Sequence, residues 1–246
     1  IVIDPLTDEI TKWIDIGVDF GLAHIVLDSN SNFAYASATD TNMVVEIDAR
    51  SYVVTRTFWL GAEHHPHGLR YSRGKLYVAD LESDVMSVIT ISDGTIIDLP
   101  VGGIAVQTAV TPNGNYVFAS IYDTKQIVRL EVGTGTLTAF SLPAGSQGAI
   151  QMYPTPDGTR LFICDQGVLL DRPASDKVYV MDVASGNIIN TVIAGDAAHG
   201  VVVSKDGTRA YITNSLDHTV SVINTIDYSI VCTIPVGAKP NGISYW

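Results

Sequence analysis

The chain has 246 residues, and its content of 46% hydrophobic and 16% charged residues is that of a well-buried globular protein rather than a disordered one. Its 14 Lys and Arg residues against 26 Asp and Glu residues give a net charge of -12, which excludes nucleic acid and anionic lipid as expected partners. No apolar run approaches the roughly 20 residues that a membrane helix needs, so we expect no membrane partner.

Short strands separated by turn-forming residues run through the whole sequence, without a helical period. The chain starts on IVID, with neither an initiator Met nor a signal peptide, which indicates a processed or truncated start. One strand type recurs and ends in a polar residue, at Asp4, Asp48, Thr90, Glu131, Asp182 and Asn224. These residues lie 44, 42, 41, 51 and 42 positions apart. A period of about 40 to 50 residues predicts the blades of a β-propeller.

The repeat unit contains four strands, as residues 198–237 show most clearly. There the runs GVVVS, RAYIT, TVSVIN and SIVCTIPV are separated by KDG, NSLDH and TIDY. Second strands recur as YASA at 35, YVAD at 77, FASI at 118, FICD at 162 and YITN at 211, and repeats open on PHG at 66, AHG at 198 and PNG at 240. These motifs resemble the Tyr-Val-Thr-Asn repeat propellers, a family close to lactonase-like and haem-d1-domain-like propellers. The resemblance covers essentially the whole chain and implies a fold but no single activity.

The sequence thus predicts an all-β fold, a β-propeller of about six four-stranded blades in one domain over residues 1–246. Five repeats are complete and begin near Gly21, Pro66, Ala105, Ala149 and Ala198. The sixth blade is divided between the ends, because residues 241–246 supply a first strand and residues 1–18 a third and a fourth. We expect this shared blade to close the ring, since closure removes exposed sheet edges. Its second strand is missing.

The loops that enter the innermost strands meet at one end of a propeller, where ligands usually bind. Aligning the repeat openers on the following turn places Ala23, His67, Val106, Ile150, His199 and Asn241 at one position. The next position holds His24, Gly68, Gln107, Gln151, Gly200 and Gly242. Each blade therefore presents one large polar side chain at this mouth: His24, His67, Gln107, Gln151, His199 and Asn241.

Three of these residues, His24, His67 and His199, are histidines from nearby blades. Neutral imidazoles that converge from neighbouring strands are typical ligands of divalent metal ions such as zinc, and they also serve as acid–base groups. A metal-free polar pocket is the main alternative. In the simplest interpretation, the PHG and AHG openers are turn chemistry in which the glycine allows a close approach.

Asp80 and Asp165 close second strands, at the position that Ala38, Ile121 and Asn214 fill in other repeats. Buried beside the histidines, these carboxylates would act as general bases, ligand contacts or metal ligands. We favour the alternative that they cap the turn by accepting hydrogen bonds from nearby backbone.

The fourth repeat is interrupted by DQGVLLDRPASDK, residues 165–177, which is about ten residues longer than its counterparts. Its place between second and third strands puts this loop at the mouth. Leu169 and Leu170 would then cover a ligand, and Arg172 would bind an anion. A tolerated surface insertion fits the sequence equally well.

No GxSxG elbow, phosphate-binding glycine loop, HExxH or paired CxxC motif is present. Two classes of function remain. We expect a small-molecule ligand or substrate, and we expect the protein to be a monomer. The first is an enzyme of lyase, lactonase or isomerase type, in which the three histidines bind a metal or transfer protons and Gln107, Gln151 and Asn241 orient the substrate. The second is a non-catalytic propeller that binds a ligand or a protein partner; a redox role with haem or copper ranks third.

The two cysteines, Cys164 and Cys232, fall in strand-like runs of different repeats, and we expect both to be free thiols. Absence of a disulfide is weak evidence on the compartment. A secreted or periplasmic location is favoured only slightly.

Overall fold

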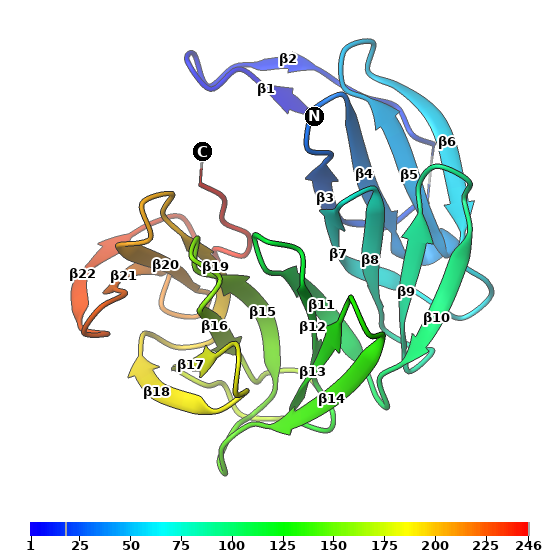
Figure 1. Cartoon of the computed structure of the whole chain (residues 1–246). Helices are drawn as coiled ribbons and strands as arrows, with labels where there is room; N and C mark the ends of the chain where they lie inside the picture. The colour runs from blue at the N-terminus through cyan, green and yellow to red at the C-terminus, as the bar shows by residue number, and fades with distance from the viewer. Residues whose placement is uncertain (18, 246) are drawn as a thin grey trace.

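The computed structural model describes residues 1–17 and 19–245 and arranges them as antiparallel sheets around a common axis (Figure 1). Five sheets have four strands each, in chain order, and one sheet has two strands. The structure thus confirms an all-β fold of four-stranded repeats, and we call the five larger sheets blades 1 to 5. In the described part of the chain, no helix is long and apolar enough to cross a membrane.

The strands of each blade follow one another along the chain. Blade 1 contains β3 (Leu22–Leu27), β4 (Phe33–Ala38), β5 (Met43–Asp48) and β6 (Val53–Trp59), with the 3-10 turn η1 (Thr39–Thr41) after β4. Blade 2 contains β7 (Pro66–Ser72), β8 (Lys75–Asp80), β9 (Val85–Thr90) and β10 (Ile96–Pro100). Blade 3 contains β11 (Ala105–Val110), β12 (Tyr116–Ile121), β13 (Gln126–Glu131) and β14 (Thr136–Ser141). Blade 4 contains β15 (Ala149–Pro154), β16 (Arg160–Asp165), β17 (Lys177–Asp182) and β18 (Ile188–Ile193), and blade 5 contains β19 (Ala198–Val203), β20 (Arg209–Asn214), β21 (Thr219–Asn224) and β22 (Ile230–Pro235).

The polar residues that predicted the repeat occupy equivalent places. The last residue of each third strand pairs with the first residue of the second strand, as Asp182 does with Arg160. Its carbonyl oxygen also accepts the amide of the residue four positions later. This bond recurs in six turns, at Asp4, Asp48, Thr90, Glu131, Asp182 and Asn224.

The innermost strand of every blade is irregular at the predicted opener positions. The pairing with the second strand shifts between Pro66 and Leu69 in β7, and at the corresponding places in β3, β11, β15 and β19. Such a bulge sets extra residues of one strand against its partner and re-aims their side chains. Two successive opener positions can therefore both serve the mouth, although side chains of a regular strand alternate between faces.

Hydroxyl side chains connect the inner strands of neighbouring blades. Ser120 Oγ accepts the amide of Gln107 at 3.1 Å and donates to the carbonyl oxygen of Ile150, in the next blade, at 2.7 Å. The same pair of bonds is made by Ser37 to His24 and His67, and by Thr213 to Gly200 and Asn241. In each case the amide comes from the second aligned opener position and the carbonyl oxygen from the first. The bonds therefore confirm the predicted alignment of the openers.

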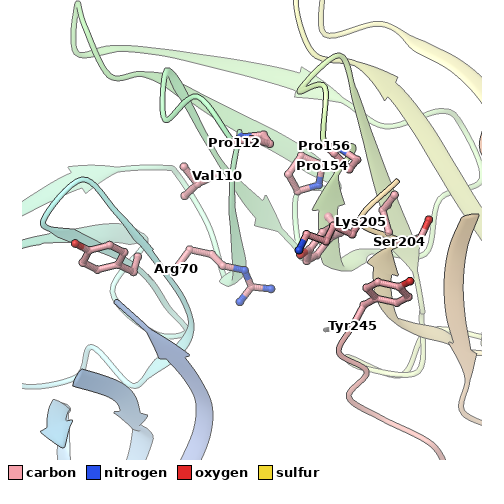
Figure 2. Close-up of a pocket in the computed structure, with 11 residues that line it drawn as sticks. Arg70, Val110, Pro112, Pro154, Pro156, Ser204, Lys205 and Tyr245 are labelled. Carbon is pink, nitrogen blue, oxygen red and sulfur yellow. The ribbon is translucent and has the colours of Figure 1, made fainter. Parts of the chain in front are cut away.

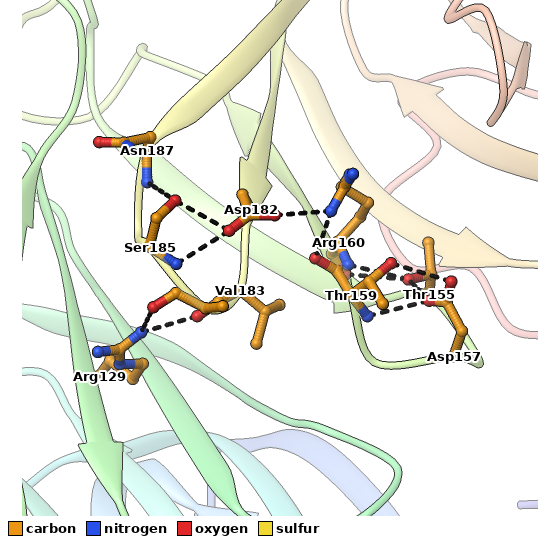
Figure 3. Close-up of polar contacts among 10 residues, drawn as sticks. Arg129, Thr155, Asp157, Thr159, Arg160, Asp182, Val183, Ser185 and Asn187 are labelled. Atoms are coloured by element: carbon orange, nitrogen blue, oxygen red, sulfur yellow. Dashed lines mark hydrogen bonds and ion pairs between the residues drawn. The ribbon is translucent and has the colours of Figure 1, made fainter.

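The hydrophobic core lies between adjacent blades. Phe118 of blade 3, for example, belongs to one buried cluster with Met152 and Tyr179 of blade 4. Across the same junction, Arg129 Nη1 donates to the carbonyl oxygen of Val183 at 2.7 Å (Figure 3). Arginine–carbonyl bonds of this kind are charge-assisted and fix the angle between blades.

Both cysteines are free thiols, as predicted. Cys164 is buried in the cluster between blades 4 and 5, where burial raises its pKa. Cys232 is exposed on the outermost strand β22.

The predicted closure of the ring is not confirmed. β1 (Val2–Ile3) pairs only with β2 (Ile10–Lys12), and residues 241–245 contain no strand. Figure 1 draws this hairpin beside blade 1 and the C-terminal segment beside blade 5. The reason is the order of strands within a blade, because pieces that supply strands 1 and 3 share no hydrogen-bonding edge unless strand 2 lies between them. Val18 and Trp246, which belong to the predicted segments, lie outside the described residues.

Candidate functional site at the channel mouth

A cavity of about 580 Å³ lies at the end of the axis where the inner strands begin, and we call it the mouth pocket. Its volume is typical of small-molecule sites. Four of the six predicted mouth residues line it: His67, Gln107, Gln151 and His199. The remaining walls include apolar side chains, so the pocket combines a few polar groups with a largely apolar surface.

His67 is held in one neutral tautomer. Its Nδ1 lies 2.8 Å from the carbonyl oxygen of Val106, and since a carbonyl only accepts, Nδ1 carries the proton. Burial lowers the pKa of His67, while the bond to Val106 opposes that shift. Nε2 therefore retains a lone pair on a side chain that lines the mouth pocket. An imidazole in this state can accept a proton or a hydrogen bond from a ligand.

His199 is also neutral near pH 7. Burial lowers its pKa to about 4; the backbone of Asn241 opposes this shift and the charge of His67 adds to it. Asn241 nevertheless makes no well-aligned hydrogen bond to the ring, because Nδ1 of His199 is buried without a partner among the described residues. His199 thus lines the pocket while its Nδ1 stays buried and unpartnered among the described residues.

His24 lies behind the pocket rather than in its wall. Its ring packs edge-on against His67 at 4.9 Å between centroids, and Gln107 Nε2 lies 3.4 Å from His24 Nε2. Burial lowers the pKa of His24 to about 3, and His67, Arg70 and His199 add to this shift when they carry their charge. His24 therefore contacts two residues that line the pocket, His67 and Gln107, and its role as a direct ligand stays a prediction.

Amide side chains provide the other polar groups. Gln107 is buried and its Oε1 accepts the amide of Thr108 at 2.9 Å, which fixes its orientation. Gln151 and Gln166 line the pocket without a side-chain hydrogen bond to the described residues. Their amides are thus free to meet a ligand. Asn241, by contrast, does not line the pocket, and its carbonyl oxygen binds Thr213.

The long loop of blade 4 covers one side of the mouth pocket, where Leu169 and Leu170 form part of the wall. The hydroxyl of Tyr122 donates to the carbonyl oxygen of Leu169 at 2.9 Å and accepts its amide at 3.1 Å. The backbone has positive φ at Val168, Leu170 and Asp171, which is unfavourable for non-glycine residues and most unfavourable for a β-branched one. This strained conformation is held in place by contacts with blade 3.

Arg172 supplies most of those contacts. Its guanidinium donates to the carbonyl oxygens of Tyr122, Gln147 and Asp123 at 2.8, 3.1 and 2.9 Å, and it stacks over the ring of Tyr122. Both Nη groups of Arg172 thus bond to backbone oxygens, so Arg172 anchors the loop. Its contact with an anionic ligand stays a prediction.

Asp165 does not face the mouth pocket either. It is fully buried and accepts hydrogen bonds from the hydroxyls of Ser146 and Ser175 and from the amides of Gln147 and Gly148. The prediction of a ligand contact is corrected in favour of the turn-capping alternative. Side chains alternate along a strand, so the residue after the second strand, and not its last residue, turns towards the mouth.

Asp80 takes the equivalent position in blade 2. Ser87 Oγ donates to Asp80 Oδ2 at 2.6 Å, and Nδ1 of His64 lies 3.4 Å from the same oxygen. Burial raises the pKa of Asp80 to about 6, although Ser87 and His64 act in the opposite direction. The carboxyl forms a cluster inside the blade and does not line the pocket, so its prediction as a ligand contact is also corrected.

The three histidines are not arranged as a metal centre in this structure. Within residues 1–17 and 19–245, no group of three His, Cys, Asp or Glu side chains is arranged to hold a metal ion. The ring of His24 lies edge-on to that of His67, at 4.9 Å between centroids. A metal ion on the three histidines stays a prediction.

Sequence reasoning missed Tyr122, Gln166 and Leu81, which line the mouth pocket together. Each follows directly after a second strand, and its amide donates to the backbone of the loop that enters the inner strand. The same alignment that placed Asp80 and Asp165 would have found these residues one position later.

No family model matches the chain. The uncharacterized protein YwhL of Bacillus subtilis (strain 168) is 27% identical over 201 residues, which cover 64% of this chain and 43% of that protein. The chain thus spans less than half the length of this curated relative.

Solved structures share the fold over nearly the whole chain. Virginiamycin B lyase from Staphylococcus aureus has a TM-score of 0.82 at 16% identity, covering 99% of this chain and 80% of the lyase chain. A catalytically inactive variant of that lyase, with a histidine replaced by alanine and with quinupristin, has a TM-score of 0.81 at 16% identity, over 98% of this chain and 80% of the lyase chain.

Two further neighbours share the fold, one named a lyase and one named a synthase. A streptogramin B lyase has a TM-score of 0.79 at 14% identity, over 92% of this chain and 74% of its own. Hydrazine synthase of Kuenenia stuttgartiensis has a TM-score of 0.67 at 15% identity, over 95% of this chain and 92% of the synthase chain. Identities this low establish a common fold and leave activity open. The chain thus shares the β-propeller fold that its repeat motifs implied.

Proposed function

We propose that the chain is a lyase-type enzyme that binds a small molecule in the mouth pocket and removes a proton from it with His67. The observation that carries this proposal is the free Nε2 of a neutral His67, whose tautomer is fixed by the bond from Nδ1 to Val106 and whose side chain lines a largely apolar cavity. A base held in a single tautomer within such a cavity is suited to take a proton from carbon.

The reaction would be an elimination. His67 Nε2 accepts the proton from a carbon next to a carbonyl group, the electrons of the C–H bond form a C=C bond, and the bond to a leaving oxygen breaks. A leaving group that departs as a stable anion needs no second proton. The free amides of Gln151 and Gln166 would donate to the carbonyl oxygen as negative charge develops on it.

The neighbours named as lyases support this reaction class, and the inactive histidine-to-alanine variant supports a catalytic histidine in this fold. The alternative is a non-catalytic propeller that binds a ligand or a protein partner. The contacts of Tyr122 and Arg172 preform the pocket. They support the enzyme and the non-catalytic alternative equally, because a binding protein also benefits from a preformed site.

Quinupristin, the compound in the neighbouring lyase structure, is a suitable first probe. Binding is measured by calorimetry, and turnover by chromatography with mass spectrometry, for the unchanged protein and for His67→Ala and His199→Ala. Loss of a general base costs about 10²- to 10⁴-fold in rate, so His67→Ala should abolish detectable turnover while the protein stays folded.

His218→Ala is the control, because His218 is exposed in blade 5 and neither lines the pocket nor pairs with a residue that lines it. Binding without turnover in the unchanged protein would establish the non-catalytic alternative for this ligand. Turnover that survives in His67→Ala would remove His67 from the mechanism.

We also propose that the two ends of the chain belong to one blade. The turn after Asp4 has the bond of a turn between third and fourth strands, and Thr213 holds Asn241 where an inner strand should lie. Both ends thus have the local geometry of parts of a blade that lacks its second strand.

A further inference from the structure

The inner strands also surround a second cavity, of about 550 Å³, at the opposite end of the axis. All inner strands run in the same direction, and this cavity is lined where they end, at Arg70, Val110, Tyr153 and Val203. None of its lining residues belongs to the mouth pocket. We call it the distal pocket (Figure 2).

Arg70 is the central polar group of the distal pocket. Figure 2 shows its guanidinium extending into the space between the walls, opposite Lys205 and Tyr245. Its one hydrogen bond among the described residues is from Nη1 to the carbonyl oxygen of the preceding Leu69, at 2.9 Å. An arginine has five N–H donors, so most of those of Arg70 are left for another partner.

Several other arginines of the chain have their charge or most of their donors engaged, although Arg209, like Arg70, bonds only to the carbonyl oxygen of the residue before it. Arg56 and Arg160 each lie 2.7 Å from a carboxylate, whereas no carboxylate oxygen of the described residues lies within 4.0 Å of Arg70 or Lys205. Burial lowers the pKa of Arg70, which shows that the guanidinium is partly desolvated. Arg70 and Lys205 thus place two cations without a carboxylate partner among the described residues around one cavity.

The walls around these cations are mostly apolar or aromatic. Pro112, Pro154 and Pro156 contribute flat rigid rings, and Tyr71 and Tyr153 contribute aromatic ones. Apolar walls with a few converging polar groups describe a small-molecule site. A planar carboxylate matches the fork of a guanidinium with two parallel hydrogen bonds.

From this juxtaposition we propose that the distal pocket binds an aromatic or cyclic monocarboxylate, with its carboxylate on Arg70, a further charge contact from Lys205 and its ring against the prolines and tyrosines. The site is separate from the mouth pocket and does not depend on the reaction proposed there.

Phenylacetate and its neutral analogue phenylacetamide provide the test, by calorimetry at low salt with the whole chain. We expect phenylacetate to bind at least ten-fold more tightly than phenylacetamide. Arg70→Met should reduce phenylacetate binding to the level of the amide, and Lys205→Met should reduce it several-fold. Arg50→Met, which removes the same charge from an exposed site, should leave it unchanged, and so should His67→Ala at the other pocket.

The proposal is overturned if the unchanged protein shows no saturable binding, if acid and amide bind equally, or if Arg70→Met binds phenylacetate as well as Arg50→Met does. Circular dichroism and thermal unfolding check that each variant folds. Should Arg70→Met fail to fold, Arg70→Lys keeps the charge without the planar fork, and equal binding by that variant and the unchanged protein would overturn the bidentate contact.

Discussion

The neutral histidines at the mouth link the site to the pH dependence of stability. Burial lowers the pKa of His24 to about 3 and that of His199 to about 4, and it also lowers that of His67. Histidines of an unfolded chain titrate near 6.5. Below that pH the unfolded state binds protons that the folded state does not, so the stability that these residues contribute above pH 6.5 is lost as the pH falls towards 4.

We therefore expect the free energy of unfolding to fall between pH 7 and pH 5 because of these groups. Asp80 acts in the opposite direction, since its pKa is raised to about 6 and the folded state takes up its proton first. Urea unfolding at pH 7, 6 and 5 measures the trend. The fall in the free energy of unfolding should be smaller in a triple variant with His24→Gln, His67→Gln and His199→Gln, and unchanged in His65→Gln. An equal fall in the unchanged protein and in both variants would contradict the role of the three histidines.

Asp165 should be important for stability although it does not face the pocket. Its carboxylate is buried and accepts two hydroxyls and two backbone amides, so an amide side chain there would place an N–H group against donors. Asp165→Asn should destabilise the protein by about 1–3 kcal/mol in chemical denaturation. Asp176→Asn, at a half-exposed carboxylate 3.9 Å from Lys177, is the control and should cost less than about 1 kcal/mol.

Sequence reasoning placed single residues well where the repeat fixes them. The openers could be aligned because each is followed by a turn of defined chemistry, and the bonds of Ser37, Ser120 and Thr213 confirm that alignment. It did not predict the contacts of Arg172 and Asp80. Hydrogen-bond partners of such residues come from other blades or from loops without a repeat, and a single repeat unit carries no information about them.

At the scale of elements, the loop over the mouth combines strain with anchoring. Val168 has a left-handed backbone conformation, which costs of order 1–3 kcal/mol for such a residue. Tyr122 and Arg172 hold the loop in this conformation. The sequence predicted the place of this loop from its extra length. It could not predict the anchors, because Tyr122 lies in a different blade and contacts the loop through the backbone of Leu169 and the side chain of Arg172.

Loss of the Arg172 anchor should therefore open the loop without unfolding the blades. Arg172→Met removes three charge-assisted bonds, and an opening free energy lower by about 1.4 to 3 kcal/mol corresponds to roughly 10- to 100-fold more frequent opening. Limited proteolysis by chymotrypsin at Leu169 or Leu170 measures this, with Arg50→Met as control. Equal cleavage rates in both variants would show that the loop is held by other contacts.

At the scale of the whole molecule, the fold could be predicted because its period recurs along the chain, whereas the state of the sixth blade could not. Ile25 shows the consequence. It is 64% exposed, although its counterparts Leu69, Met152 and Val201 at the same register position are at most 3% exposed. The repeat predicts that Ile25 is buried. Its burial depends on a neighbouring four-stranded blade, and the described residues form only a two-stranded sheet there.

A strand supplied from outside should fill this place. The peptide GTRAYITNS, which repeats residues 207–215, has the sequence of a second strand and can pair with the C-terminal segment on one side and with β1 on the other. Ile25 and Leu27, which together with Ile3 line an apolar groove beside the N-terminal hairpin, would then lose contact with water.

Because a ligand that binds only the folded state stabilises it by RT ln(1 + [L]/Kd), the unfolding temperature should rise with peptide concentration. A scrambled peptide of the same composition controls for non-specific hydrophobic binding, and Ile25→Ser should weaken the effect by removing apolar contact area. If the native and scrambled peptides shift the unfolding temperature equally, the two ends do not form the open blade that the repeat implies.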